Sequence, residues 1–280
     1  MKILIAGATG FVGKKVLLRL LKLNHSISII QSSHSNNLFD NQLDEKIIFN
    51  ILKNDDYEKK FKDFNVKKFD CFLFFFWADL PNYNSHIVHK QNYIVSKKFI
   101  DFLFKKGLNK IYTAGTCYEY LGHSGEVYED LRINTKLPYP YYKNKLRAYL
   151  DQKYNNRYNI KSSWIRIFYV YSKEQKESSL VPQLHKNNYK KIEINSSSRI
   201  VDISHVNTHV KLIIKILCSK KSFKVVNCCS GKPISIKRFV LNYIKRNNLK
   251  INVKFKDNKK RNYETDFWGS NKLLNRIVDN

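Results

Sequence analysis

Residues 2–21, "KILIAGATGFVGKKVLLRLL", decide the fold. The stretch starts as a short apolar strand, and after the glycines its apolar residues recur at helical spacing. The turn between strand and helix carries a GxxGxxG pattern. Glycines let the backbone turn sharply and approach a pyrophosphate, which the free N–H groups and the dipole of the following helix stabilise. We therefore predict a dinucleotide site formed by Gly7, Thr9, Gly10, Phe11, Val12 and Gly13.

The rest of the first half alternates between strand and helix patterns. Apolar stretches predict strands over 26–30, 46–52, 70–77, 110–116 and 162–170, and a long helix over about 86–105. The stretch "DCFLFFFW" at 70–77 is apolar on both faces, which is typical of a central parallel strand covered by helices. This alternation predicts an α/β fold, a Rossmann-type doubly wound parallel sheet.

The second half is less regular, and we expect it to form a smaller C-terminal substrate-binding lobe. The predicted dinucleotide-binding domain spans residues 1–170, with a return segment over about 200–230. The predicted lobe comprises residues 171–199 and 231–280.

The end of the second strand bears on the choice of cofactor. An acidic residue there would bind the adenosine ribose hydroxyls, whereas an arginine would favour a 2′-phosphate. The sequence has Gln31, Ser32 and Ser33 instead, so no carboxylate repels a 2′-phosphate and the serines are able to donate to it. The pattern favours NADP slightly over NAD.

Composition narrows the classes of partner. The chain has 280 residues and a net charge of +28, carried mostly by lysines spread along its whole length. Such a field attracts anions, but without a basic block we expect no dedicated nucleic-acid site. The five cysteines are scattered, and the sequence shows no metal-ligand spacing. It also has no apolar run long enough to span a bilayer and no signal-peptide layout. We therefore predict a cytoplasmic protein without a metal or a membrane partner.

Two overlapping Tyr-x-x-x-Lys pairs lie in "PYPYYKNKLRAYL" at 138–150. A lysine four residues after a tyrosine lies on the same helix face and lowers the pKa of the phenol, which makes the phenol a usable proton donor. Tyr139 precedes Pro140, and a residue before proline is pushed toward extended backbone, so we expect the helix to begin at Pro140. With that start, Tyr139 lies before the helix, so its spacing to Lys143 is not a helical one. We therefore favour Tyr141 with Lys145 as the catalytic pair.

With its glycine turn and its Tyr-x-x-x-Lys, the sequence resembles the extended short-chain dehydrogenase/reductases, the NAD-dependent epimerase/dehydratase family that modifies nucleotide sugars. The segments "LRINTKLPYPYYKNK" (131–145), "WIRIFYVYS" (164–172) and "RIVDISHV" (199–206) extend the resemblance over nearly the whole chain. Within the family, "FWADLPNY" (76–83) and "AGTCYEY" (114–120) are most similar to reductases of 4-keto-6-deoxy sugar nucleotides, the dTDP-6-deoxy-L-talose 4-dehydrogenase type.

The resemblance implies roles for four residues. Thr116 would hydrogen-bond the substrate carbonyl, Tyr141 would protonate it, and Lys145 would hold the nicotinamide ribose, while Asn92 would contact the cofactor. The Asp-Glu pair that family dehydratases carry after the threonine is absent, which disfavours dehydration. The implied reaction is NAD(P)-dependent reduction of a C4 keto group for surface polysaccharide sugars of the bacterial type. A 4-epimerase is the alternative, and a non-catalytic nucleotide- or nucleic-acid-binding protein on the same fold is a weaker one.

The resemblance also implies a nucleotide-sugar substrate and a homodimer. The candidate substrate-binding residues are Trp77, Asn82, Tyr83, Cys117, Tyr118, Tyr169, Ser179, Lys186 and Arg199.

Overall fold

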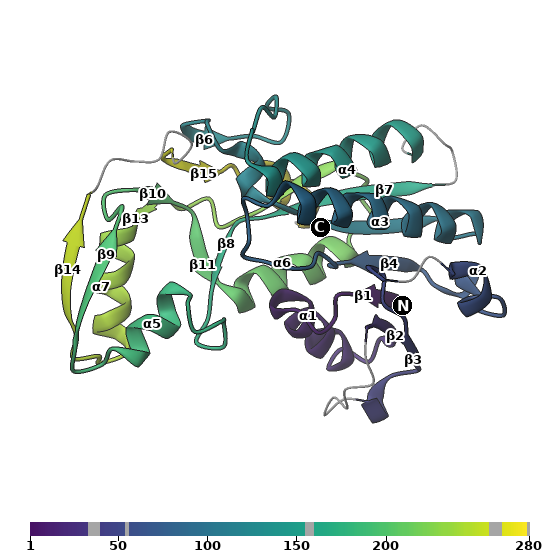
Figure 1. Cartoon of the computed structure of the whole chain (residues 1–280), viewed down its shortest axis with the longest axis horizontal. Coiled ribbons are helices and arrows are strands. Elements are labelled where there is room, and N and C mark those ends of the chain that lie inside the picture. Colours follow the sequence, from purple (N-terminus) through teal and green to yellow (C-terminus); the bar gives the residue numbers. More distant parts are fainter. Residues whose placement is uncertain (33–39, 54–55, 155–159, 258–264, 279–280) are drawn as a thin grey trace. The chain divides into compact units, whose positions relative to one another are not determined.

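A seven-stranded sheet forms the centre of the first of two compact units. The computed structural model describes residues 1–32, 40–53, 56–154, 160–257 and 265–278. The first unit comprises residues 1–119, 136–166 and 220–226. Its strands follow the order β12-β7-β5-β4-β1-β2-β3, and the neighbours from β5 to β3 pair in parallel (Figure 1). They are β1 (Lys2–Ala6), β2 (Ser26–Gln31), β3 (Glu45–Ile48), β4 (Cys71–Phe74), β5 (Lys110–Thr116), β7 (Lys161–Ile167) and β12 (Val225–Cys228).

Helices flank this sheet on both faces. They are α1 (Phe11–Leu21), α2 (Tyr57–Lys60), α3 (His86–Lys105) and α4 (Pro138–Tyr154), with 3-10 turns at Asp40–Gln42, Val66–Lys68 and Cys117–Tyr120. Figure 1 shows α3 and α4 together on one side of the sheet and α1 on the other. The apolar strand predicted over 70–77 supplies Phe72 and Phe74, which are fully buried in the main core with Phe99 of α3.

The second unit comprises residues 120–135, 167–219 and 227–280. Its strands form a four-stranded sheet, β13-β10-β15-β6, and two parallel ribbons, β11-β8 and β14-β9. They are β6 (Gly125–Val127), β8 (Tyr169–Tyr171), β9 (Lys191–Asn195), β10 (Ile200–Val201), β11 (Ile203–His205), β13 (Ile234–Ser235), β14 (Asn252–Lys256) and β15 (Phe267–Gly269). Its helices are α5 (Leu180–Lys186), α6 (Val206–Cys218), α7 (Ile236–Arg246) and α8 (Lys272–Val278). A separate core joins α5, α7 and β9.

The predicted Rossmann-type fold class is confirmed, while several predicted limits differ from the structure. The strand expected over 162–170 is broken at Phe168, whose N–H donates to the Cys228 carbonyl, so that β8 is free to pair with β11. The strand expected over 46–52 ends at Ile48, and a turn follows at residues 51–53. Residues 120–135, 167–170, 200–219 and 227–230, expected with the dinucleotide-binding domain, fall in the second unit. None of the helices in the described ranges is long and apolar enough to cross a membrane.

Candidate active site

The glycine turn has the geometry that a dinucleotide site requires. Gly7 follows β1 with a φ of +82°, in the left-handed region that side chains rarely adopt. A Cβ placed on Gly13 would lie 2.2 Å from the carbonyl oxygen of Gly7, so α1 packs against the turn only because residue 13 is glycine. Gly10 caps α1 without a side-chain hydrogen bond, and the first turn of the helix carries no acidic residue. The N–H groups at this helix start are therefore available to an anion.

The predicted cofactor residues beyond the turn lie at the ends of neighbouring strands. Gln31 ends β2 and is buried, whereas Ser32 is exposed directly after it. Ser33 lies outside the described residues. Asn92, on α3, accepts from the Ala78 N–H at 2.7 Å and donates to the Ala78 and Val88 carbonyls, so it holds the segment that follows β4.

The predicted start of the active-site helix is wrong, because α4 begins at Pro138 rather than at Pro140. The Tyr141 N–H donates to the Leu137 carbonyl at 3.0 Å, which is already a helical bond. The first N–H groups of a helix have no partner within it, so prolines at 138 and 140 cost the helix no hydrogen bond. The Tyr139 N–H is satisfied outside the helix by the Tyr83 carbonyl at 3.1 Å.

With the corrected start, the local geometry no longer favours the Tyr141–Lys145 pair over the other. Tyr139 and Lys143 both lie inside α4, one turn apart, on the face that also buries Leu146 and Leu150. Tyr141, by contrast, is 40% exposed, and Lys145 is exposed as well. Two residues along a helix turn the side chain by roughly 200°, so the Tyr141–Lys145 pair points away from the core. The structure brings Thr116 together with Tyr139, not with the pair that the sequence favoured.

Aromatic rings surround Tyr139. Its ring centroid lies 5.4 Å from Tyr83, 6.1 Å from Tyr118, 5.3 Å from His89 and 6.3 Å from Trp77. Burial raises the pKa of Tyr139, while a hydrogen bond from the Thr116 hydroxyl acts in the opposite direction. The phenol therefore stays protonated at neutral pH, and its pKa is raised, not lowered as the Tyr-x-x-x-Lys pattern predicted.

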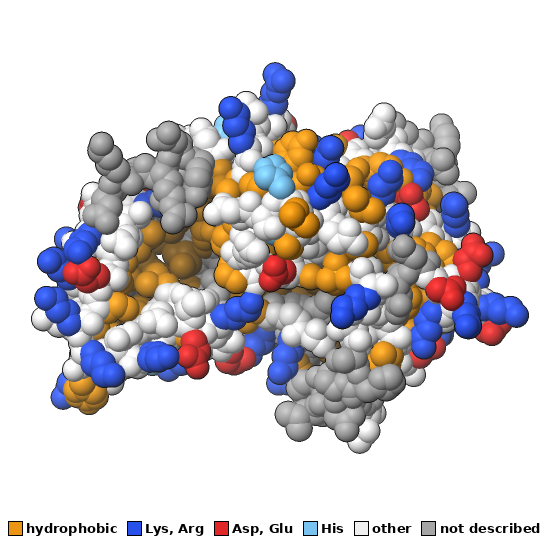
Figure 2. Space-filling view, in the orientation of Figure 1, with side chains coloured by type: hydrophobic (Ala, Val, Ile, Leu, Met, Phe, Trp, Pro, Cys, Tyr) orange, Lys and Arg blue, Asp and Glu red, His pale blue; other side chains and the backbone are white. Residues whose placement is uncertain are grey.

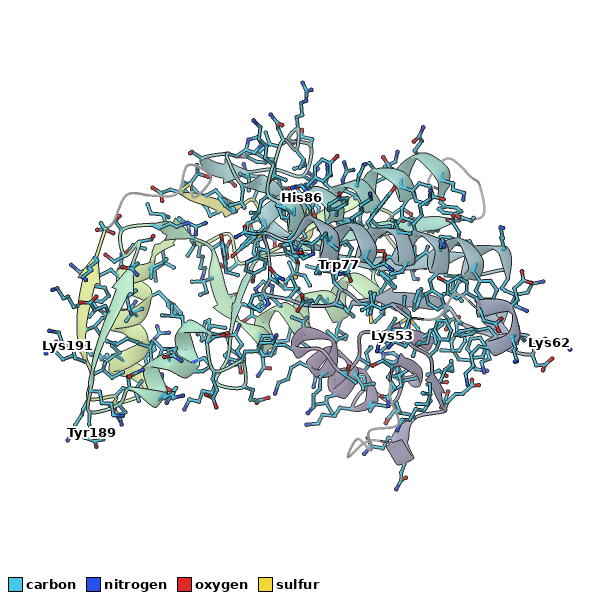
Figure 3. The ribbon with its side chains drawn as sticks, in the orientation of Figure 1. Lys53, Lys62, Trp77, His86, Tyr189 and Lys191 are labelled. Atoms are coloured by element: carbon cyan, nitrogen blue, oxygen red, sulfur yellow. The ribbon has the colours of Figure 1, made fainter. Side chains whose placement is uncertain are left out.

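Lys143 is almost completely buried beneath the same cluster. Its Nζ donates to the Ala114 carbonyl at 2.8 Å and lies 4.2 Å from the ring centroid of Trp77. Trp77 is labelled in Figure 3. Burial lowers the pKa of Lys143 to about 7, and the charge of Glu119 acts in the opposite direction. Trp77 is itself fixed, because its indole N–H donates to His89 Nδ1 at 3.1 Å and the other ring nitrogen of His89 donates to the Asn82 carbonyl.

Glu119 is a buried carboxylate that sequence reasoning missed. It accepts from the Thr116 backbone N–H at 3.1 Å and from the Trp164 indole at 2.8 Å, both through Oε1. Its Oε2 accepts from Arg166 Nε at 2.8 Å, and both charged side chains are at most 1% exposed. The only signal in the sequence was an acid inside the otherwise apolar stretch that follows the threonine strand. Glu119 thereby fixes the end of β5, where Thr116 stands.

The predicted substrate-binding residues fall into two groups. Trp77, Tyr83 and Tyr118 lie around Tyr139 in the first unit, as described above, and the Asn82 amide donates to Asp79 while Cys117 is buried.

In the second unit, Arg199 is buried and its guanidinium donates to the Tyr169 hydroxyl at 2.7 Å. Ser179 stands before α5 without a capping bond, and Lys186 forms an exposed ion pair with Glu177.

The first-unit arrangement suits proton transfer at a carbonyl. It has a hydroxyl donor, a buried phenol and a lysine, and the same unit carries a turn fitted to a dinucleotide. Nowhere in the described ranges do three or more His, Cys, Asp or Glu side chains gather as metal ligands would.

Comparison with protein families decides the assignment. Residues 3–229 match the family described as NAD dependent epimerase/dehydratase. The chain belongs to this NAD-dependent epimerase/dehydratase family.

A relative with a known activity agrees with this family assignment. A dTDP-6-deoxy-L-talose 4-dehydrogenase (NAD(+)) from Aggregatibacter actinomycetemcomitans is 27% identical over 278 residues, which cover 96% of this chain and all of that protein. This match confirms the predicted resemblance.

Solved structures share the fold. An NAD-dependent NDP-hexosamine 5,6-dehydratase of tunicamycin biosynthesis superimposes with a TM-score of 0.82 at 16% identity, over 100% of this chain and 91% of that one. A UDP-glucose 4-epimerase from Thermotoga maritima gives a TM-score of 0.81 at 16% identity, over 99% and 92% of the two chains. A UDP-glucuronic acid 4-epimerase from Bacillus cereus gives 0.78 at 19% identity, over 99% and 90%. At these identities the likeness concerns the family fold alone.

Proposed function

We propose that this chain reduces the C4 keto group of a nucleotide-activated 4-keto-6-deoxy sugar, using a nicotinamide dinucleotide. The observation that carries the proposal is the contact of Thr116 with Tyr139, one helical turn before the buried Lys143. The relative from Aggregatibacter is named for the 4-dehydrogenation of a 6-deoxy sugar nucleotide, which is the same chemistry in the opposite direction. Synthesis of sugars for bacterial surface polysaccharides is part of the same proposal.

Tyr139 replaces Tyr141 as the proposed acid. Its hydroxyl would protonate the carbonyl oxygen, and the Thr116 hydroxyl would donate a hydrogen bond to the same oxygen. A substrate ring would lie against the aromatic side chains of Trp77, Tyr83 and Tyr118 that flank Tyr139. Asn82, Cys117, Tyr169, Ser179, Lys186 and Arg199 stay predictions as substrate contacts.

Lys143 replaces Lys145 as the lysine proposed to hold the nicotinamide ribose. When protonated it would hold the nicotinamide ribose and stabilise the phenolate that remains after proton transfer. Because its pKa is lowered to about 7, its charge depends on pH in the neutral range.

The turn formed by Gly7, Gly10 and Gly13 would hold the pyrophosphate of the cofactor, with Asn92 and the end of β2 beside it. The bound dinucleotide would supply the hydride. The absence of an acid at Gln31 and Ser32 still favours NADP slightly, whereas the relative from Aggregatibacter is named for NAD(+). The ratio of kcat/KM for NADPH and NADH decides between them.

Matched tyrosine variants test the proposal. With reduced cofactor and a dTDP- or GDP-linked 4-keto-6-deoxyhexose, we expect the wild-type chain to oxidise the cofactor. Tyr139→Phe removes the proton donor and should lower kcat by about a hundredfold or more, with cofactor affinity unchanged. Tyr141→Phe, which removes an exposed hydroxyl two residues along the same helix, should change kcat by less than about twofold.

Two outcomes would contradict the proposal. A large loss in Tyr141→Phe with an active Tyr139→Phe would restore the pair that the sequence favoured. Interconversion of two nucleotide sugars without net use of added cofactor would favour a 4-epimerase instead.

A further inference from the structure

His89 is a buried titratable side chain beside the proposed reaction centre, and the proposed reaction gives it no role. It lies on α3 one helical turn before Asn92, and both side chains are at most 1% exposed. Its ring centroid is 5.3 Å from that of Tyr139. Burial of an imidazole is unfavourable unless its nitrogens are hydrogen-bonded, and both nitrogens of His89 are.

The two hydrogen bonds of His89 fix which nitrogen carries its proton. The Trp77 indole N–H is only a donor, so Nδ1, 3.1 Å away, must accept and carries no proton. The Asn82 backbone carbonyl is only an acceptor, so Nε2, 2.7 Å away, must donate. Both bonds are therefore satisfied by the neutral ring alone. A second proton would turn an N–H group on Nδ1 toward the Trp77 N–H and break that bond.

His89 holds the segment of residues 77–83, which follows β4. Trp77 is the first residue of this segment and Asn82 the last but one, so the two ring nitrogens hold the segment near both ends. Asn92 holds the backbone of the residue after Trp77 from the next turn of α3. The 77–83 segment is therefore attached to α3 at three points.

The 77–83 segment depends on these bonds for its shape. All seven of its residues are described by the structure, and they contain no helix or strand, so no regular backbone ladder supports them. Asp79 has a φ of +62°, a left-handed conformation that a residue with a side chain keeps only where the surrounding structure imposes it. Loss of the bond at one end of the segment should therefore let its backbone relax.

The same segment forms part of the proposed reaction centre. The Trp77 ring centroid lies 4.2 Å from Lys143 Nζ, and the Tyr83 ring lies 5.4 Å from that of Tyr139. The Tyr83 carbonyl also accepts from the Tyr139 N–H at 3.1 Å. A displacement of the segment would therefore move two rings that we expect to contact substrate, and it would disturb the start of the helix that carries the proposed acid.

The surroundings of His89 keep its ring neutral at pH 7. Burial lowers the pKa of His89, although the carbonyl to which it donates and the charge of Asp79 act in the opposite direction. Lys143 on α4 and His86 on α3 lower the pKa further, because each adds positive charge nearby. Tyr139 faces the ring as a neutral phenol. His89 therefore gains a second proton only in acid, below the ordinary histidine pKa of about 6.5.

We propose that His89 is a positioning residue whose neutral form holds the 77–83 segment against the reaction centre and whose protonation releases Trp77. The bond to the Asn82 carbonyl persists in acid, because Nε2 donates in both forms of the ring. Trp77 would lose its fixed place beside Lys143, and the sugar would lose a ring to lie against. The effect on the reaction rests on the proposed function, whereas the release of Trp77 does not.

Two substitutions of His89 separate its hydrogen bonds from its titration. His89→Gln keeps both bonds, because the amide oxygen accepts from Trp77 and the amide N–H group donates to the Asn82 carbonyl, but glutamine does not titrate. His89→Leu removes both bonds. His86→Gln is the matched control, since it removes an exposed histidine three residues earlier on α3 (Figure 3). Thermal unfolding of the full chain at neutral pH checks that each variant is folded.

Tryptophan emission measures the release of Trp77 without any substrate. The chain has three tryptophans, so the emission that is lost in Trp77→Phe reports on this residue. We expect that emission to change in a single step as the pH falls below about 6.5. The step should persist in His86→Gln and disappear in His89→Gln. A step that persists in His89→Gln, or no step in the wild-type chain, overturns the inference.

Steady-state kinetics with reduced cofactor and a nucleotide-linked 4-keto-6-deoxyhexose measure the effect on the reaction. His89→Leu should raise KM for the nucleotide sugar about tenfold or more, with a smaller change in kcat and unchanged cofactor affinity. His89→Gln should stay within about twofold of the wild type at neutral pH and lose the acid limb that we expect in the wild-type kcat/KM profile below about pH 6.5. An unchanged KM in a folded His89→Leu variant overturns the positioning role.

The two measurements keep this inference apart from the proposed function. An emission step in a chain that turns over no such sugar contradicts the proposed function and supports His89 as the residue that positions Trp77. Turnover without an emission step contradicts the inference and leaves the proposed function standing.

Discussion

The buried carboxylate of Glu119 contacts the groups that position the proposed reaction centre. Its Oε1 holds the Thr116 backbone, and its Oε2 holds Arg166. The same negative charge opposes the lowering of the Lys143 pKa. We regard Glu119 as a positioning residue, because it acts through Thr116 and Lys143 instead of touching substrate.

A double variant removes this charge together with that of its partner, Arg166. Glu119→Gln keeps an acceptor for Thr116 and Trp164 but turns an amide N–H group toward Arg166, and an unpaired buried arginine costs about 3–5 kcal/mol. The variant Glu119→Gln with Arg166→Met removes both charges together and should fold. Without the carboxylate, the pKa of Lys143 falls further, so the alkaline limb of the kcat/KM profile should move to lower pH. An unmoved limb in a folded double variant contradicts the coupling.

His209 predicts a loss of stability in mild acid. Burial lowers its pKa to about 4, and its ring is hydrogen-bonded to the Ser204 hydroxyl at 2.8 Å. An unfolded histidine has a pKa of about 6.5, so between about pH 6.5 and 4 the unfolded state binds more protons. The free energy of unfolding should therefore fall by up to about 3 kcal/mol as the pH drops through that window. Urea unfolding at several pH values measures it: His209→Gln should flatten the dependence, and the exposed His86→Gln should not.

The sequence predicted the kinds of residue at the proposed reaction centre, whereas our proposal takes the other tyrosine–lysine pair. A tyrosine, a lysine four residues later and Thr116 were all expected. The two pairs overlap, and local backbone rules favoured the later one because Pro140 follows Tyr139. The proposal of Tyr139 depends on the Tyr83 carbonyl, which lies 56 positions away in the sequence and satisfies the Tyr139 N–H within the helix start.

At the scale of elements, the packing of α1 on β1 depends on one glycine. A Cβ at residue 13 would lie 2.2 Å from the Gly7 carbonyl oxygen, whereas a Cβ at Gly10 would lie 3.3 Å from the same atom. Gly13→Ala must displace the start of α1, and we expect cofactor affinity to fall about tenfold or more. Gly10→Ala needs a shift of only a few tenths of an ångström and should have the smaller effect. Fluorescence titration with NADH compares the two, and equal losses would contradict the packing account.

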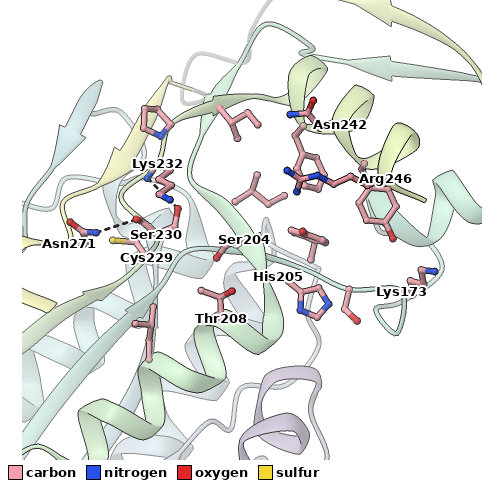
Figure 4. Close-up of a pocket in the computed structure, with 18 of the residues that line it drawn as sticks. Lys173, Ser204, His205, Thr208, Cys229, Ser230, Lys232, Asn242, Arg246 and Asn271 are labelled. Carbon is pink, nitrogen blue, oxygen red and sulfur yellow. Dashed lines mark hydrogen bonds between the residues drawn. The ribbon is translucent and has the colours of Figure 1, made fainter. Parts of the chain in front are cut away.

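Elements with strong local signals were predicted best. The helix over 86–105 and the strand over 110–116 match α3 and β5, because Ser85 caps α3 and an apolar run forms β5. The break of the strand over 162–170 was missed, since Phe168 pairs with Cys228, a partner that no local pattern reveals. A cavity of about 870 Å³ in the second unit (Figure 4) was missed for the same reason, because its lining comes from residues 171 to 275.

At the scale of the whole molecule, the charge of +28 is distributed and not focused. Figure 2 shows Lys and Arg side chains scattered over the visible surface of the chain, with Asp and Glu between them. This matches the spread of lysine along the sequence. A general positive field steers anions toward the protein without selecting among them.

This field predicts a salt effect on the encounter step. Between about 10 mM and 0.5 M salt the Debye length falls from about 30 Å to a few ångströms, so attraction of a nucleotide sugar is screened. We expect KM for the nucleotide sugar to rise several-fold over this range, while kcat stays constant because the chemistry occurs among buried groups. Steady-state kinetics at four salt concentrations measure both. A KM that does not depend on salt would show that the net charge has no role in substrate capture.

The two prolines that begin α4 have a consequence for conformational entropy. Pro138 and Pro140 stand on either side of Tyr139, and each ring fixes its own φ near −65°. The segment therefore has few conformations even in the unfolded chain, and it loses little entropy when it is ordered. The hydroxyl proposed to donate the proton is thus attached to one of the stiffest short segments in the sequence. The two prolines thus reduce the conformational entropy that folding must remove from the segment that carries this tyrosine.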